Sequence, residues 1–374
     1  METYFAPAKR SGKMQLASQI RNIGSCHVMD TLLRASAGLL LVINANRQVI
    51  AFNKACADSL GIADTEKALG LRFGEILHCK HAFEEPHGCG TTPYCSSCGA
   101  VITMMAAIDD NRACERICAL TTERNGQSHD ICLLVRSQPV VTDGKRWILV
   151  YAQDISLQQH WANLENEFLH DLDNMLCQVK NFGDYLHDQA PAHEVLNKLR
   201  LTTDRVFREV KLQNKLKHHR QIKSLAKIER VNLRSIRNMV FNIVLYRSVM
   251  TGKNVVEEGP ADDLYISTDP VLVSRVIINM LLNALEATEL GETIKLRTLV
   301  EETRITWQVW NKAFIPENIQ LRIFQKFFST KPEIGKGHGT HVMKLLAEKY
   351  LGGDVGFVST IAEGTTFSFT LQTG

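Results

Sequence analysis

The feature that most constrains this chain is a change in the spacing of its apolar residues near position 157. From there to about position 186 they recur every three or four residues, which predicts one apolar stripe along a helix. The stripe consists of Trp161, Leu164, Phe168, Leu172, Met175, Val179, Phe182 and Leu186. A short break, DQAPAH, follows, and a second stripe from about position 193 predicts a second helix. Because a lone hairpin of helices buries only part of such a stripe, we expect a homodimer with a four-helix bundle.

The segments on either side of this hairpin carry strand patterns. Residues 33–156 hold short apolar runs around the turns NANR, ERNGQ and TDGK, which favour an antiparallel sheet. Residues 226–374 mix strand-like runs with helical ones, so they predict an α/β domain. The chain is therefore expected to be a multidomain α+β protein with four parts. These are an N-terminal segment (1–32) of open function, a mixed domain (33–156), the hairpin (157–225) and the α/β domain (226–374).

The last of these parts can be divided further. TDPVLVSRVIINMLLNALEAT predicts a helix with Asp269 as its N-cap and Pro270 in its first turn. TIKLRTLVEETRITWQVW predicts two strands, and KGHGTHVMKLLAEKYLGG a glycine-rich loop leading into a helix that stops at Gly352 and Gly353. DVGFVST and TTFSFTLQ predict closing strands around the turn AEG.

Composition excludes several classes of protein. The 374 residues, 45% of them hydrophobic and 22% charged, suit two or three globular domains. The formal net charge of +3 is too small to indicate direct binding of nucleic acid. No apolar run approaches the ~18 residues of a membrane span, and the start, METYFAPAKR, lacks the apolar stretch of a secretory signal. We therefore expect a cytoplasmic protein without a membrane span.

The sequence FLHDLDN places a histidine opposite the apolar stripe of the first helix. At about 100° per residue, His170 lies about 200° around the helix from Phe168, which argues against a buried histidine. Asp171 adjoins His170 and can orient the imidazole and raise its basicity, while Asn174 lies one turn further on. Metal binding is disfavoured because that next-turn residue is an asparagine. An exposed polar patch and a reactive imidazole both remain open.

Polar and glycine residues with phosphate chemistry recur near the C-terminus. Asn279 and Asn283 share one face of a predicted helix, and the amide oxygen of Asn283 can hold Mg²⁺ close to phosphates. Alternating glycines before a helix let backbone N–H groups approach a phosphate, and a nearby lysine can meet its charge. These residues are Gly335, Gly337, Gly339 and Lys331. Taken singly, the same features also fit an exposed polar stripe and a mobile turn.

In this order, the motifs resemble the catalytic half of sensor histidine kinases over residues 156–374. FLHDLDN resembles the phospho-acceptor box, INMLLNALEA the asparagine box, FQKFFSTK the phenylalanine box and GKGHGTH the glycine-rich lid. The resemblance implies that ATP with Mg²⁺ phosphorylates His170, with Asp171 as base and Asn174 as helper, and that the phosphoryl group passes to an aspartate of a response regulator. It also implies the α/β sandwich of that ATPase superfamily. The nucleotide contacts it implies are Asn279, Asn283, Asn311, Lys331, Gly335, Gly337, Gly339, Thr340 and Thr365.

One box departs from the family pattern. In VWNKAFIP, Asn311 stands where an aspartate usually meets the adenine amino group, and Ala313 and Phe314 stand where glycines are usual. An amide oxygen still accepts a hydrogen bond, but without the charge of a carboxylate. The sequence therefore leaves three functions open: a kinase, a kinase-like scaffold with a decayed ATP site, and a phosphatase of its response regulator.

The first domain carries a second resemblance. GLLLVINANRQVIAFNKACADSLG, followed much later by WILVYAQDIS, resembles a PAS sensor domain. That family implies a five-stranded antiparallel sheet with flanking helices and a pocket for a small molecule or cofactor. The residues DIS would then lead directly into the first hairpin helix.

The loop HCKHAFEEPHGCGTTPYCSSCG within this domain is rich in cysteine. Cys79, Cys89, Cys95 and Cys98, the last two as C-x-x-C, can ligate Zn²⁺ or an iron–sulfur cluster. His78, His81 and His87 can substitute for a ligand. The other interpretation is a set of redox-labile thiols in a surface loop, because clustered cysteines in a reducing compartment indicate metal or redox chemistry.

Overall fold

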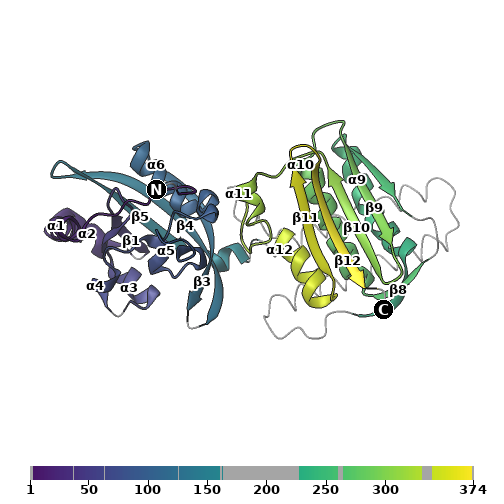
Figure 1. The fold of residues 1–374 in the computed structure, drawn as a ribbon, viewed down its shortest axis with the longest axis horizontal. Helices are drawn as coiled ribbons and strands as arrows, with labels where there is room; N and C mark the ends of the chain where they lie inside the picture. The colour runs from purple at the N-terminus through teal and green to yellow at the C-terminus, as the bar shows by residue number, and fades with distance from the viewer. Residues whose placement is uncertain are drawn as a thin grey trace. The chain divides into compact units, whose positions relative to one another are not determined.

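The computed structural model describes residues 3–36, 38–62, 64–124, 126–160, 162, 227–259, 264–330 and 339–372. The chain divides into two compact units, drawn in Figure 1. We call Met1–Gln159 with Gln325–Ile334 the N-terminal unit, and His160–Phe324 with Gly335–Gly374 the C-terminal unit. All but five residues of the predicted hairpin lie outside the described residues, namely 161 and 163–225.

The N-terminal unit is built on a five-stranded antiparallel sheet in the order β2-β1-β5-β4-β3. Tight turns join the neighbouring long strands, and residues with positive φ occupy them, namely Gly126 after β3 and Asp143 and Gly144 after β4. The predicted strands and turns are thereby confirmed. The strands are β1 (Leu39–Ile43), β2 (Val49–Phe52), β3 (Cys114–Arg124), β4 (Gln127–Thr142) and β5 (Lys145–Asp154).

Helices cover both faces of this sheet. On one face, Ile23 and Met29 of the first two helices pack with Val42, Ile50 and Trp147. The other face packs against the helices between β2 and β3. Burial from both sides explains why β1 is a continuous apolar run. The helices are α1 (Lys13–Gly24), α2 (His27–Ala35), α3 (Lys54–Leu60), α4 (Thr65–Ala68), α5 (Phe73–Ile76), α6 (Gly99–Asp109) and the 3₁₀ turns η1 (Lys80–Ala82) and η2 (Pro93–Ser97).

The C-terminal unit is a layer of helices on a mixed sheet in the order β11-β12-β10-β9-β7 (Figure 1). Only the β7–β9 pair is parallel among the described pairs of this sheet. One apolar core joins α9, α10 and α12 to the sheet, as expected for a two-layer sandwich. The elements are β6 (Glu229–Asn232), α9 (Leu233–Met250), β7 (Asn254–Glu258), β8 (Tyr265–Thr268), α10 (Pro270–Ala287), β9 (Thr293–Val300), β10 (Arg304–Asn311), α11 (Glu317–Gln320), α12 (Gly339–Lys344), the π-helical η3 (Leu345–Tyr350), β11 (Asp354–Thr360) and β12 (Gly364–Gln372).

Helix α10 forms the centre of this core and begins as predicted. The Asp269 carboxylate accepts from the backbone N–H groups of Val271 at 2.9 Å and Leu272 at 3.1 Å. Its second oxygen accepts from the Lys227 N–H at 2.7 Å. By length and composition alone, the 18 residues of α10, with a mean hydropathy of 1.4, could span a membrane, so the expected absence of a span stays a prediction. Of this 18-residue stretch, 67% is buried inside the unit, as in the core helix of a globular domain.

Candidate functional site

Two asparagines of the C-terminal unit have buried amide nitrogens without a hydrogen-bond partner within the described part of the chain. They are Asn283 on α10 and Asn311 at the end of β10. A buried N–H group without an acceptor costs about 1–3 kcal/mol, so such groups need an explanation. A bound polar ligand that supplies acceptors would remove this cost.

The first asparagine lies beside the start of α12. A Cβ atom added to Gly339 would stand 3.8 Å from the Asn283 Oδ1. The structure therefore brings the predicted asparagine box and the end of the predicted lid together, although they lie far apart in the sequence. Asn279 lies one helical turn before Asn283 and is half-buried. Lys331, Gly335 and Gly337 lie outside the described residues, as do His170, Asp171 and Asn174.

The second asparagine is set by the pairing of β10 with β12. Asn311 is 3% exposed and lies directly opposite Thr365. The Thr365 hydroxyl donates to the Ala313 carbonyl at 2.6 Å and contacts the Ser359 hydroxyl at 2.7 Å. The Ser359 Oγ also accepts from the Ile315 N–H at 2.9 Å. These contacts fix the segment after Asn311, so Thr365 holds the chain that carries Asn311.

A glycine is required where this segment turns. Gly364 has a φ of 76°, and a Cβ there would lie 2.3 Å from the Asn311 carbonyl oxygen. Sequence reasoning placed Gly364 in the turn AEG, but a turn signal does not reveal its close approach to Asn311. Sequence reasoning missed Ser359.

The helix that follows the predicted lid is attached to the predicted phenylalanine box. The Thr340 hydroxyl donates to the Ile323 carbonyl at 2.5 Å, and the His341 Nδ1 lies 3.2 Å from the Phe324 carbonyl oxygen. Thr340, which we expected to contact nucleotide, is therefore engaged with protein in this structure. Its contact positions the N-terminal end of α12 beside Asn283.

Comparison with known proteins shows what this site belongs to. Residues 268–374 match the family described as histidine kinase-, DNA gyrase B-, and HSP90-like ATPase. This part of the chain is a histidine-kinase-type ATPase domain. Such a domain implies ATP, typically with Mg²⁺, and the two unpartnered asparagine amides fit a polar ligand of this kind.

Curated relatives are also kinases or sensor proteins. The chain is 36% identical over 106 residues to the circadian input-output histidine kinase CikA of Synechococcus elongatus, covering 27% of this chain and 14% of that protein. It is 25% identical over 237 residues to the sensor protein KdpD of Clostridium acetobutylicum, covering 58% and 25%. It is 24% identical over 236 residues to the sensor histidine kinase YcbM of Bacillus subtilis, covering 60% and 75%. The match therefore spans a quarter or less of the first two relatives.

The N-terminal unit offers a second candidate site in its Cys-rich loop, residues 78–99. The loop is held against β3 at both ends. At its start, Cys79 forms an isolated antiparallel β-bridge with Thr122, and the Glu123 N–H donates to the His78 carbonyl at 2.9 Å. At its end, the Cys98 and Cys118 sulfur atoms lie 3.6 Å apart.

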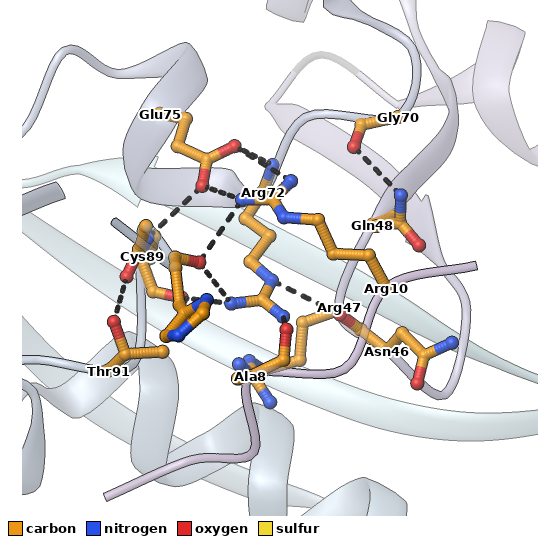
Figure 2. A network of polar contacts seen from close by, with 12 residues as sticks. Ala8, Arg10, Asn46, Arg47, Gln48, Gly70, Arg72, Glu75, Cys89 and Thr91 are labelled. Atoms are coloured by element: carbon orange, nitrogen blue, oxygen red, sulfur yellow. Dashed lines mark hydrogen bonds and ion pairs between the residues drawn. The ribbon is translucent and has the colours of Figure 1, made fainter. Parts of the chain in front are cut away.

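A buried arginine holds the middle of this loop (Figure 2). Arg72 has no exposed surface, and its guanidinium donates to six backbone carbonyls. Two of the acceptors belong to the loop, three to the N-terminal segment and one to the turn between β1 and β2. The loop acceptors are His87 and Cys89, the acceptors of the N-terminal segment are Pro7, Ala8 and Lys9, and the turn acceptor is Asn46. The donor–acceptor distances are 2.9 to 3.3 Å. Arg72 thereby joins three segments that are distant in sequence.

Glu75 completes this network. Its carboxylate accepts from the Cys89 N–H at 3.1 Å and the Arg72 N–H at 2.9 Å, and it pairs with Arg10. Burial, together with the positive charges of Arg47 and Arg10, lowers the pKa of Arg72 to about 10. The network therefore includes an energetic cost of desolvation, which its many hydrogen bonds offset. Sequence reasoning missed these residues entirely.

The predicted zinc or iron–sulfur site is not supported. Among the described residues, no group of three or more His, Cys, Asp or Glu side chains is arranged to hold a metal ion. The Cys89 and Cys95 thiols are desolvated, and burial raises the pKa of both, with the neighbouring cysteines adding to the shift. The Cys95 sulfur contacts the Thr92 hydroxyl at 3.2 Å. Cys79, Cys95 and Cys98 all lie close enough to Cys89 to raise the pKa of its thiol.

We expect the N-terminal unit to lose stability as the pH rises above about 9. Burial raises the pKa of the Cys56 and Cys132 thiols to about 12. An acid whose pKa is higher in the folded state stabilises the fold below its unfolded pKa, and this contribution is lost as pH rises toward the folded value. Each thiol should cost about 1.4 kcal/mol per pH unit above about pH 9. Urea unfolding at pH 7.5, 9 and 10 measures this slope, which Cys132→Ala should reduce; an unchanged slope would contradict the assignment.

Proposed function

We propose that the chain is a homodimeric two-component sensor histidine kinase, in which ATP phosphorylates His170 and the phosphoryl group passes to an aspartate of a response regulator. The observation that carries this proposal is the pair of unpartnered amides, Asn283 and Asn311, inside the matched ATPase domain. The named relatives, which are sensor proteins and histidine kinases, support it. Location in the cytoplasm and the four domain boundaries remain predictions from the sequence.

The residues of the site have separate roles in this proposal. Asn283, helped by Asn279, binds the Mg²⁺–phosphate side of the nucleotide, and Asn311 contacts the base. Lys331, Gly335, Gly337 and Gly339 meet the phosphates, while Thr365 positions Asn311 through the segment that follows it. ATP supplies the phosphoryl group, and ADP is the leaving group. Asp171 orients His170 and takes up its proton, and Asn174 assists.

The N-terminal unit is proposed to act as a PAS-type sensor. Its five antiparallel strands with flanking helices are the architecture that the sequence resemblance implies, which supports the proposal. Strand β5 ends at Asp154, immediately before the predicted hairpin. A change in the sensor sheet can thus reach the hairpin along one continuous stretch of chain.

The proposal is tested by incubating the full chain with γ-labelled ATP and Mg²⁺ and measuring acid-labile label on the protein. We expect label on the parent, and about tenfold weaker nucleotide binding for Asn283→Ala, since a lost hydrogen bond to a charged group is worth about 1.5–3 kcal/mol. Asn238→Ala, which removes an exposed asparagine from α9 of the same unit, is the matched control. Equal binding by Asn283→Ala and Asn238→Ala would contradict the assigned site.

A further inference from the structure

Two thiols meet where the Cys-rich loop rejoins the sheet. Cys98 is the N-cap of α6, and Cys118 lies within β3. Their sulfur atoms are 3.6 Å apart. Cys118 is fully buried, whereas Cys98 is partly exposed. A small oxidant in solution therefore reaches Cys98 first and finds a second thiol directly behind it.

The main chains beside these two cysteines are already in contact. A Cβ atom on Gly99 would stand 2.1 Å from the Ile117 carbonyl oxygen, so only glycine allows this approach. A disulfide needs a sulfur–sulfur distance of about 2.05 Å and Cα atoms about 4.4–6.8 Å apart. With the two backbones touching one residue away, rotation of the side chains can bring the sulfur atoms from 3.6 Å to bonding distance.

The neighbouring thiols are less suited to react with Cys98. Cys89 is partly exposed, as Cys98 is, but its sulfur packs against Gly74, where an added Cβ would lie 2.8 Å away. Cys95 is buried in η2, and its sulfur contacts the Thr92 hydroxyl at 3.2 Å. The sulfur of Cys118 lies 3.6 Å from that of Cys98.

We propose that Cys98 and Cys118 form a reversible disulfide when a hydroperoxide oxidises the protein. The Cys98 sulfur attacks the O–O bond of hydrogen peroxide, which gives a sulfenic acid and one water. The Cys118 sulfur then displaces the sulfenic oxygen as a second water and forms the S–S bond. Two thiols lose two electrons in total, and one peroxide gains them. A dithiol reductant reverses the reaction.

This bond would join the start of α6 covalently to β3. The structure already holds residues 78–79 to the same strand, so oxidation would close the second end of the Cys-rich loop. The sheet that carries β3 also carries β5, which leads toward the predicted hairpin. Control of phosphorylation by this bond rests on the proposed function; formation of the bond does not.

Thiol mapping of the full chain tests the proposal. Reduced protein is freed of reductant, treated with a few equivalents of hydrogen peroxide, denatured in N-ethylmaleimide, digested and analysed by mass spectrometry. We expect a peptide that links Cys98 to Cys118 and disappears with dithiothreitol. Cys56, which is buried in the same core as Cys118, and Cys132, which is buried on β4, should remain alkylated in the same sample.

Three results would overturn it: a Cys98–Cys95 link, complete alkylation of both Cys98 and Cys118, or zinc or iron at about one atom per chain whose removal alone exposes Cys98. The mapping uses the parent protein, so it does not depend on a variant that folds. Cys118→Ser then separates the two proposals. If peroxide changes the rate of labelling from γ-labelled ATP, the change should be absent in Cys118→Ser. If no label forms at all, the proposed kinase fails while the disulfide is still decided by mapping.

Discussion

Replacing His170 by glutamine is expected to remove all acid-labile label that γ-labelled ATP places on the protein. Glutamine keeps the polarity of the position but has no nucleophilic ring nitrogen, so it cannot form the phosphorus–nitrogen bond. The loss of label should be complete, because the proposed reaction has His170 as its acceptor. Measuring label and nucleotide binding on the same preparation separates chemistry from affinity, and binding should equal that of the parent.

The chain contains a matched control for this experiment. His187 is also followed by an aspartate and also lies in the predicted hairpin, near its break. His187→Gln should therefore keep the label. Label that survives in His170→Gln would disprove His170 as the acceptor. A parent that binds nucleotide but takes no label would instead favour the scaffold or the phosphatase, which the variant box at Asn311 left open.

The parts of the fold that could be predicted from sequence are those with local signals. Apolar runs located the strands of the N-terminal sheet and β9 to β12 of the C-terminal unit, but not β6, β7 and β8. Asp269 with Pro270 marked the start of α10. Asn283 and Asn311 could be selected because each belongs to a motif of fixed order. Their unpartnered amides are consistent with that selection, although no contact with nucleotide is present to test it.

The remaining features depend on contacts between distant segments. Arg72 lies in the ordinary sequence LGLRFGE, and its acceptors are backbone carbonyls, which any residue provides. The approach of Gly99 to Ile117 likewise depends on how a helix lies on a strand. The cysteine spacing did indicate chemistry, but spacing alone could not separate a metal site from packed thiols.

Replacing Arg72 by methionine is expected to lower the free energy of unfolding of the N-terminal unit by about 3–5 kcal/mol, the usual cost of breaking a buried charged network. Methionine fills much of the same volume, so packing is largely kept. Six carbonyls lose their donor, and the Glu75 carboxylate loses a neighbouring positive charge. Urea unfolding with hydrogen exchange over residues 78–99 measures the effect.

Two effects of opposite sign compete in this variant. Arg10, Arg47 and Arg72 face a single carboxylate, Glu75, so removing one positive charge relieves repulsion. The lost hydrogen bonds should still dominate, because each buried acceptor left without a donor costs about 1–3 kcal/mol.

The stability of Arg72→Lys should fall between those of the parent and Arg72→Met, since an ammonium keeps the charge but lacks the planar fork of donors that a guanidinium offers to its acceptors. Arg112→Met removes an exposed pair with Asp110 and should change stability by less than about 0.5 kcal/mol. If Arg72→Met unfolds at the same urea concentration as Arg112→Met, the relief of repulsion cancels the hydrogen bonds, and the network does not hold the Cys-rich loop.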